Sequence, residues 1–361
     1  MAWKARLALR MGAGIAAILC LGGGGTVAAQ AAPPSLAQLV GQRLVVAMKG
    51  TRANGPLLAR IRAGQIGGVI LFSNNVVSKA QVAQLTASLQ AAAHAGGRPP
   101  LIIATDQEGG LVRRIPWAPP KRSAAQLGAL PSSVSATSGQ NTGAALHAIG
   151  INVDLAPVAD VPAGPADFIE QQQRAFSTSR FTVATDAAAF AKGLEQGGTL
   201  PVMKHFPGLG RATVSTDQAV VRITLGRSRL IRDLLPFDVA FRQTLGPVVM
   251  LSTAIYPALD SRAAAAWSRP IIHDLLRHQL GFAGVTITDS LDAAAAARGV
   301  TDPVVALRSA EAGADLLLVT GSQATSKGVY DSLLAAAQAG TLPRSRLTAS
   351  YNRIIGLKGR L

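Results

Sequence analysis

Residues 101–110 read LIIATDQEGG, an apolar run that ends in two acids and two glycines. From Leu101 to Ala104 no polar residue interrupts the run, which is typical of a parallel strand that is buried on both faces. Polar side chains at the carboxyl end of such a strand lie where the loops of an α/β fold converge. The stretch therefore predicts a buried parallel strand that delivers acids to a ligand site.

Seven more runs of this kind recur along the chain, and helical patterns lie between them. The helical segments, for example 78–95, 185–198 and 269–282, carry apolar residues at i, i+3 and i+4 and have glycine near their ends. Eight strand–helix units in about 325 residues predict an α/β fold, a single-domain (β/α)8 barrel of the TIM type. An open doubly wound sheet is the alternative, but no Gly-x-Gly-x-x-Gly follows the first strand, which weakens its dinucleotide-binding form. The eight runs span residues 43–48, 66–72, 101–106, 151–160, 200–206, 248–254, 285–290 and 316–321.

The first 32 residues have the composition of a secretory signal peptide. Three basic residues precede an apolar run broken by glycines, and residues 29–31 form a small-x-small cleavage site. An uncleaved membrane anchor is the alternative, but the glycines shorten the apolar stretch below a comfortable span. We therefore expect a mature barrel of residues 33–361 that has no transmembrane span and is secreted, periplasmic or associated with the cell wall.

Cys20 is the only cysteine of the chain, and it leaves with the signal segment. Leu19 precedes it, whereas a lipoprotein signal has a small residue at that position, so we expect no lipid anchor. Without cysteine the mature chain forms no disulfide, and its stability must come from packing. No cluster of His, Cys and acidic residues has the spacing of metal ligands, so the sequence predicts no metal site.

The formal net charge is +16, or +13 once the three cations of residues 1–32 are subtracted. In an exported protein this charge favours anionic cell-wall polymers or membrane surfaces as partners, and a solvated arginine-rich surface is the simpler explanation. The basic residues form no run of five and have few aromatic neighbours, which argues against a nucleic-acid partner. We also expect a monomer, since no second domain follows the barrel.

Asp289 ends the apolar run VTITDS at residues 285–290, so its carboxylate is predicted to point into the barrel mouth. A carboxylate in such a place can act as a nucleophile toward an electrophilic carbon, as in retaining glycosidases. The alternative is that Asp289 caps the helix beginning at DSLDAAAAA. Strands three to seven all end in polar residues, which would be costly to bury together without a function. These residues are Asp106, Gln107, Glu108, Asp154, Asp160, Lys204, His205, Ser252, Thr253 and Asp289.

Two loops carry groups that suit sugar recognition. In ATDQEGG the Asp106 carboxylate can accept paired hydrogen bonds from vicinal hydroxyls, and the glycines let a ligand approach the backbone closely. In KHFPGLG, Lys204 and His205 supply a cation and an imidazole for hydroxyl or carbonyl groups. Taken alone, His205 is more typical of a packed, hydrogen-bonded histidine.

Six motifs together resemble glycoside hydrolase family 3. LIIATDQEGG, GINVDLAPVADV, RAFSTS, MKHFPGLG, YPALD and LLRHQLGFAGVTITDSL occur in the order and at about the spacing of that family. The chain is most similar to the single-domain β-N-acetylhexosaminidase branch, which acts on N-acetylglucosaminides, including peptidoglycan fragments, and the similarity runs from residue 36 to the end. The resemblance implies a (β/α)8 barrel, a carbohydrate substrate and a retaining two-step mechanism without a cofactor.

The resemblance also implies roles for single residues. Asp289, in the TD of strand seven, would be the nucleophile that forms the covalent glycosyl intermediate. Arg114 in EGGLVRR would contact the sugar, although the family usually has arginine directly after the glycines, where this chain has Leu111. The sugar in the minus-one subsite would be held by Asp106, Arg174 of RAFS, Lys204 and His205.

The strand-five loop departs from the family pattern. The family has Lys-His-Phe-Pro-Gly-His-Gly and, four residues later, Asp-Ser-His, whose last histidine is the general acid/base. This chain has Leu209 at the second histidine of the motif. An ungapped alignment places Asp217 on the acid/base histidine, whereas a two-residue insertion places Asp217 on the aspartate and Ala219 on the histidine. Thr253 replaces another histidine after strand six, and the other four histidines lie in predicted outer helices, namely His94, His147, His273 and His278.

Two hypotheses follow from this loop. In the first, Asp217 replaces the histidine, because a carboxylic acid whose pKa is raised by burial can protonate a leaving oxygen. The chain is then a secreted glycosidase of reduced or altered activity. In the second, it is a catalytically degenerate family member that binds cell-wall sugars or regulates their turnover. The presence of Asp106, Lys204, His205 and Asp289 favours the enzyme.

Overall fold

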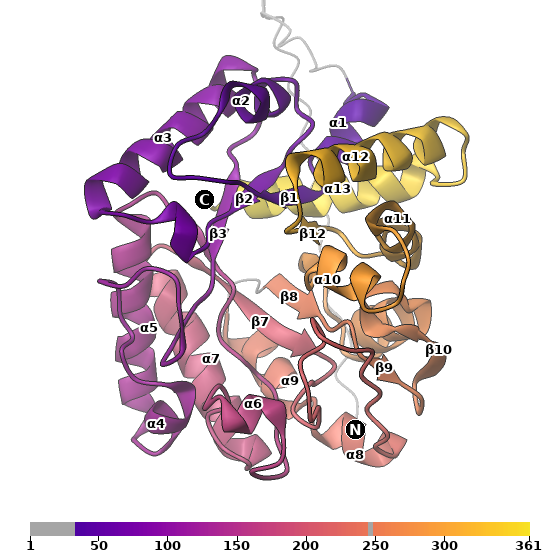
Figure 1. The fold of residues 1–361 in the computed structure, drawn as a ribbon. Helices are drawn as coiled ribbons and strands as arrows, with labels where there is room; N and C mark the ends of the chain where they lie inside the picture. The colour runs from indigo at the N-terminus through magenta and orange to yellow at the C-terminus, as the bar shows by residue number, and fades with distance from the viewer. Residues whose placement is uncertain (1–32, 245–247) are drawn as a thin grey trace, which may run out of the picture. The chain divides into compact units, whose positions relative to one another are not determined.

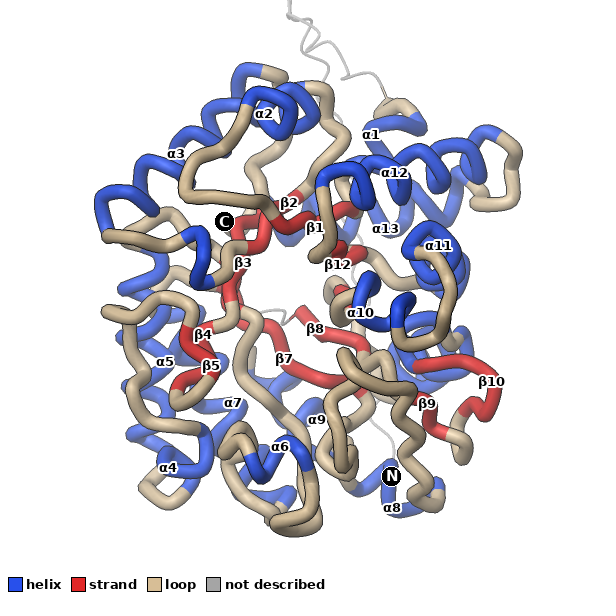
Figure 2. Tube along the Cα trace, viewed as in Figure 1, coloured by secondary structure: helices blue, strands red, loops and turns tan. Residues whose placement is uncertain are grey.

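Eight parallel strands form a ring in the computed structural model, which describes residues 33–244 and 248–361 (Figures 1 and 2). The ring closes between its last two strands through a parallel bridge from Ile287 to Leu316. The predicted barrel is therefore confirmed, and the open sheet is wrong. The signal segment predicted for residues 1–32 lies outside the described residues. In order around the ring, the strands are β1 (Leu44–Ala47), β2 (Gly68–Ile70), β3 (Ile102–Thr105), β6 (Val153–Asp154), β7 (Leu200–Phe206), β8 (Val248–Leu251), β11 (Thr286–Thr288) and β12 (Leu317–Val319).

The strands are apolar throughout because both of their faces are buried. In β1, Val45 and Ala47 belong to the cluster that fills the barrel. Leu44 and Val46, between them in sequence, pack in the larger cluster under the surrounding helices. Since side chains alternate between the two faces of a strand, a run without alternating polarity serves both cores.

Helices surround the strand ring (Figure 2). The predicted segment 78–95 is α3, which begins after Ser78, whose Oγ accepts a hydrogen bond from the Gln81 amide, and is followed by Gly96. The predicted segment 269–282 is a π-wound helix, Pro270–Gln279. None of the helices that the structure describes is long and apolar enough to span a bilayer. The α-helices are α1 (Leu36–Gly41), α2 (Gly55–Arg62), α3 (Lys79–Ala95), α4 (Ala124–Gly128), α5 (Ser132–His147), α6 (Phe168–Gln171), α7 (Arg180–Gln196), α8 (Arg227–Arg232), α9 (Leu235–Gln243), α10 (Leu291–Ala296), α11 (Asp302–Ala312), α12 (Gln323–Gln338) and α13 (Arg344–Lys358).

The predicted fourth strand, 151–160, is regular only over the two residues of β6. Pro157 has no N–H to donate to a ladder. The carbonyls of Ala156 and Pro157 nevertheless accept the amides of Val202 and Lys204, at 2.9 and 3.2 Å. The segment therefore continues beside β7 and carries Asp160 toward the end of that strand.

Two short hairpins lie outside the ring. The first, β4 (Gln107–Gly109) with β5 (Val112–Arg113), follows β3 directly. The second, β9 (Ile255–Tyr256) with β10 (Asp260–Ala264), follows β8. Gly109 and Gly110 have φ values of 103° and 55°, which glycine adopts without steric cost, so they permit the tight turn between β4 and β5.

Candidate active site

A cavity of about 360 Å³ lies at the carboxyl ends of the strands. Its polar lining comes from β7 and from the segments that follow β3, β6, β7 and β11, and apolar residues such as Phe72, Val112, Phe168 and Leu209 form part of the wall. The structure thus brings together all seven of the site residues named from the sequence. These are Asp106, Arg114, Arg174, Lys204, His205, Asp217 and Asp289.

A cluster of buried charges forms part of the cavity wall. Lys204 Nζ lies 2.9 Å from Asp106 Oδ1 and 2.6 Å from Glu108 Oε1. Arg174 binds the same Glu108 carboxylate with two hydrogen bonds of 2.8 Å, from Nε and Nη2. Two cations therefore face two carboxylates, and the fork-to-fork geometry of Arg174 fixes its orientation.

These contacts set the ionisation of the cluster. Burial disfavours the charge of Glu108, but the cations of Arg174 and Lys204 outweigh it and hold the pKa of Glu108 well below its usual range. Burial likewise opposes the charge on Lys204, yet the carboxylates of Asp106 and Glu108 raise its pKa. Both groups therefore remain charged at neutral pH.

Asp106 links this cluster to a further cation, Arg114. Its Oδ1 accepts from Lys204, while its Oδ2 lies 3.9 Å from Arg114 Nε. The Asp106 side chain is partly exposed, and the Arg114 guanidinium lies 5.8 Å from the ring centre of Phe72. Oδ2 and the guanidinium can both reach a ligand, so the pair offers an acceptor and a donor to adjacent hydroxyl groups.

His205 is oriented by a carboxylate that we did not assign from the sequence. Asp160 Oδ2 lies 2.7 Å from His205 Nδ1, and Asp160 Oδ1 accepts the backbone amides of His205 and Leu209 at 3.1 and 2.6 Å. The contact at Nδ1 turns Nε2 toward the cavity. Gly210 then passes so close to Val161 that a Cβ would lie 2.3 Å from its carbonyl carbon, so the strand-five loop needs glycine there. The motif KHFPGLG is thus held near its start by the contacts of His205 with Asp160 and at its end by the packing of Gly210 against Val161.

We expect Asp160→Asn to lower the free energy of unfolding by about 1–3 kcal/mol, because an amide turns a donor toward the N–H groups that the carboxylate accepts. Urea unfolding at pH 7 would measure this, with an unchanged m value. The control is Asp331→Asn, which removes an exposed ion pair with Lys327 and should cost less than about 0.5 kcal/mol. Equally small losses in both variants would show that Asp160 does not hold the loop.

Asp289 stands at the end of β11, with Oδ1 accepting the amide of Ser290 at 2.8 Å. Helix α10 begins at Leu291 with Ser290 in the N-cap position, and no side chain caps it. The alternative role of Asp289 as a helix cap is therefore wrong. Its carboxylate lines the cavity instead.

Asp217 lies in a turn of the strand-five loop, where its amide donates to Ser215 Oγ at 3.1 Å. The side chain is exposed at the mouth, and its carboxyl still lines the same cavity as Asp289. Partial removal from water and then the charge of Asp289 raise the pKa of Asp217 to about 6. A carboxyl of this kind exchanges a proton readily near neutral pH.

Asp154, at the end of β6, is a further buried acid beneath the charge cluster. Its Oδ1 accepts the Gln107 amide at 2.9 Å, and its Oδ2 has no partner among the residues that the structure describes. Burial raises the pKa of Asp154 to about 8, so this carboxyl carries a proton at neutral pH. The cluster of Asp106, Glu108, Arg174 and Lys204 then keeps balanced charges.

Comparison with known proteins agrees with this geometry. Residues 36–357 match the glycosyl hydrolase family 3 N-terminal domain. An uncharacterized secreted glycosyl hydrolase of Arthroderma benhamiae is 35% identical over 342 residues, which cover 93% of this chain and 96% of that protein. Beta-hexosaminidase A of Pseudoalteromonas piscicida is 34% identical over 330 residues, which cover 82% of this chain and 54% of that longer protein.

The crystal structure of a β-N-acetylhexosaminidase from Beutenbergia cavernae has the same fold, with a TM-score of 0.84 and 35% identity. The match covers 91% of this chain and 99% of that structure. A family model over nearly the whole described chain and relatives above 30% identity agree with the motifs around the cavity. The chain belongs to glycosyl hydrolase family 3.

Proposed function

We propose that this protein is a retaining glycosidase that cleaves β-N-acetylglucosaminides, with Asp289 as the nucleophile and Asp217 as the acid/base. The observation that carries the proposal is the meeting of Asp289, Asp217 and the charged cluster around Lys204 at one cavity. The relatives named as β-hexosaminidases support the substrate class. As the natural source of these glycosides we favour the peptidoglycan-type sugars of the cell wall.

The reaction takes two displacements at the anomeric carbon. First, a carboxylate oxygen of Asp289 attacks this carbon, the bond to the aglycone oxygen breaks, and Asp217 gives that oxygen its proton. Because Oδ1 of Asp289 accepts the Ser290 amide, we assign the attack to Oδ2. Water then attacks the same carbon, the ester to Asp289 breaks, and Asp217 takes up the proton of the water.

Sugar recognition falls to the cluster of buried charges and its neighbours. In our proposal Asp106, Lys204, His205 and Arg174 hold the sugar in the minus-one subsite, and Arg114 adds a donor at the mouth. Lys204, Arg174 and His205 are fixed by short contacts to carboxylates, and Asp106 is held in turn by Lys204. Fixed groups lose little conformational entropy when a ligand binds.

The role of Asp217 predicts a pH dependence. The group must be protonated to assist departure, so kcat/KM for a substrate with a poor leaving group should fall as pH rises through about 6. In Asp217→Asn this fall should disappear, and the loss at pH 5 should be about 10²–10³-fold for a methyl glycoside. An aryl glycoside with a good leaving group should lose far less, and equal losses for both substrates would contradict the assignment.

We also propose that the protein is secreted and that residues 1–32 are its signal peptide. The basic, apolar and small-residue parts of residues 1–32 support it. One relative is named as a secreted hydrolase. N-terminal sequencing of the protein recovered from culture medium or envelope would test it, with a mature end near Ala32 as the expected result.

A burst experiment distinguishes the enzyme from a sugar-binding protein. Rapid mixing with an aryl N-acetyl-β-glucosaminide that carries a good leaving group should release about one equivalent of aglycone before the steady state, because such a group departs without a proton. The burst should be absent in Asp289→Ala. Tight sugar binding without any burst in the parent protein would instead support the degenerate, sugar-binding alternative.

A further inference from the structure

Two adjoining cavities rich in arginine lie away from the candidate active site. The first, of about 360 Å³, has five arginines in its lining, and the second, of about 500 Å³, has three. They share Arg269, Glu311 and Ala312, and Glu311 is the one carboxylate residue in either lining. The first cavity lies where the chain enters β1 and β12, at the opposite end of the barrel from Asp289.

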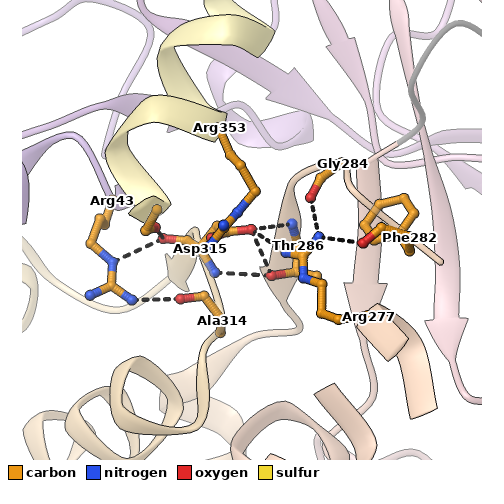
Figure 3. A network of polar contacts seen from close by, with 9 residues as sticks. Arg43, Arg277, Phe282, Gly284, Thr286, Ala314, Asp315 and Arg353 are labelled. Carbon is orange, nitrogen blue, oxygen red and sulfur yellow. Dashed lines mark hydrogen bonds and ion pairs between the residues drawn. The ribbon is translucent and has the colours of Figure 1, made fainter. Parts of the chain in front are cut away.

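The arginines of the first cavity are held in place by the protein. Arg277 Nη2 lies 2.7 Å from Asp315 Oδ2, and Arg353 Nη2 lies 2.7 Å from Asp315 Oδ1 (Figure 3). Thr286 also donates its amide to Asp315 Oδ2 at 2.9 Å. One buried carboxylate thus fixes two guanidinium groups, whereas a third cation beside them makes no ion pair with that carboxylate.

That third cation is Arg43, which is 2% exposed and lines the cavity. It donates to the carbonyls of Asp315 and Ala314, at 3.1 and 2.5 Å, and it makes no ion pair with any described carboxylate (Figure 3). Burial, together with the positive charge of Arg353, lowers the pKa of Arg43 to about 10 despite the nearby Asp315. An anion in the cavity would supply the missing countercharge.

The second cavity extends this positive surface along the side of the barrel. Arg262, Arg269 and Arg308 line it, and no hydrogen bond or ion pair to any of their side chains is present in the described part of the chain. All three side chains are exposed. They are free to follow a ligand that continues out of the first cavity.

The carbonyl end of α11 faces the first cavity and would by itself repel an anion. One of these carbonyls is already occupied, since Arg346 donates to Glu311 O at 2.7 Å, and just beyond the helix Arg43 donates to Ala314 O. Across both linings seven arginines face Glu311 and the buried Asp315. The local charge therefore stays strongly positive after the internal pairs are counted.

We propose that the two cavities form one binding site for a phosphate-bearing polyanion, with one phosphate group at Arg43, Arg277 and Arg353 and the next at Arg269 and Arg308. Guanidinium groups bind phosphate oxygens through paired N–H donors, and preorganised ones bind at low entropic cost. Two linked subsites favour a chain of phosphates over a single ion, because the second contact is intramolecular. The site is independent of the glycosidase chemistry proposed above.

Calorimetric titration of the full chain tests the site with two probes, inorganic phosphate and a short linear polyphosphate. Polyphosphate is expected to bind at least about 100-fold more tightly than phosphate. Its affinity should fall steeply with added salt. Equal affinity for the two probes, or no binding of polyphosphate, would overturn the proposal.

The double variant Arg269→Gln/Arg308→Gln locates the site. It should weaken polyphosphate binding at least tenfold and reduce the salt dependence, while the melting temperature in plain buffer stays unchanged because both side chains are exposed. The matched control, Arg227→Gln/Arg229→Gln, removes two exposed arginines of α8 that line neither cavity and should bind within twofold of the parent. Equal weakening in both variants would show non-specific attraction to the net charge. Binding to anionic lipid vesicles without binding to soluble polyphosphate would also contradict the assignment.

Discussion

Replacement of Asp289 by alanine should lower turnover of an aryl N-acetyl-β-glucosaminide by at least about 10⁴-fold. The reason is that the covalent route that we propose depends on the carboxylate at the end of β11, and an alanine leaves nothing to attack the anomeric carbon. The residues around Lys204 that we propose to hold the sugar stay in place, so substrate affinity should change little. Steady-state kinetics of the purified variant measures both quantities.

Two further observations separate loss of the nucleophile from loss of the fold. Added azide should restore aglycone release in Asp289→Ala and give a glycosyl azide of inverted configuration, because the small anion takes the place of the missing carboxylate. The matched control is Asp292→Asn, whose carboxylate accepts from Thr320 and does not line the cavity. Its activity should remain within about tenfold of the parent, and a collapse comparable to that of Asp289→Ala would contradict the assignment.

The second large effect concerns Glu108. Glu108→Gln should lower the free energy of unfolding by about 3–5 kcal/mol, because it leaves the cations of Arg174 and Lys204 with one carboxylate, Asp106, between them. Burial opposes ionisation, but Arg174 and Lys204 depress the pKa of Glu108, so its stabilising charge is present at neutral pH and lost on acidification. The difference between parent and variant should therefore shrink as the pH falls below about 4.

Urea unfolding between pH 3 and 7 would measure this difference. Asp238→Asn serves as the control, since it removes a carboxylate from an exposed pair with Arg242 and should cost less than about 0.5 kcal/mol. Because Arg174 and Lys204 are also expected to hold the sugar, Glu108→Gln should raise KM as well. A pH-independent loss no larger than that of the control would mean that the buried cluster does not stabilise the barrel.

The barrel was predictable because both faces of each ring strand are buried, one inside the barrel and one under the helices, so the strands are apolar on both faces. All eight strands of the ring lie within runs identified by their apolar character, and in β1 alternate residues pack in the two cores. The shortened β6 was not predictable in the same way. Its continuation past Pro157 depends on amides of β7 about 45 residues away, and a single sequence does not reveal that pairing.

The sequence predicted the residues that line the cavity better than the carboxylates that hold those residues in place. Asp106, Lys204 and Asp289 stand at strand ends, where the fold itself implies a function. Glu108 was visible as an acid beside Asp106, and the two-residue alternation from Asp106 could have placed it on the same side. Asp160 was visible as a polar residue at a strand end, but its pairing with His205 was not, because His205 lies 45 residues further along the chain.

The strand-five loop differs from the family motif at two residues that line the cavity, Leu209 and Asp217. Leu209 lines the cavity where the family motif has histidine, and Asp217 reaches the same cavity with a pKa raised to about 6, first by partial burial and then by Asp289. A protonated carboxyl at this position fits the acid role. The polar residues of the loop therefore favour altered proton transfer over loss of the reaction.

Mass spectrometry of the protein quenched during turnover of an aryl N-acetyl-β-glucosaminide would show whether Asp289 forms a covalent bond to the sugar. Peptides from the acid-quenched protein should include the one that contains Asp289 with the added mass of a single N-acetylhexosaminyl group, and fragmentation should place the ester on that side chain. The label should be absent in Asp289→Ala. Turnover by the parent without any labelled Asp289, or with the label on Asp217, would contradict the account.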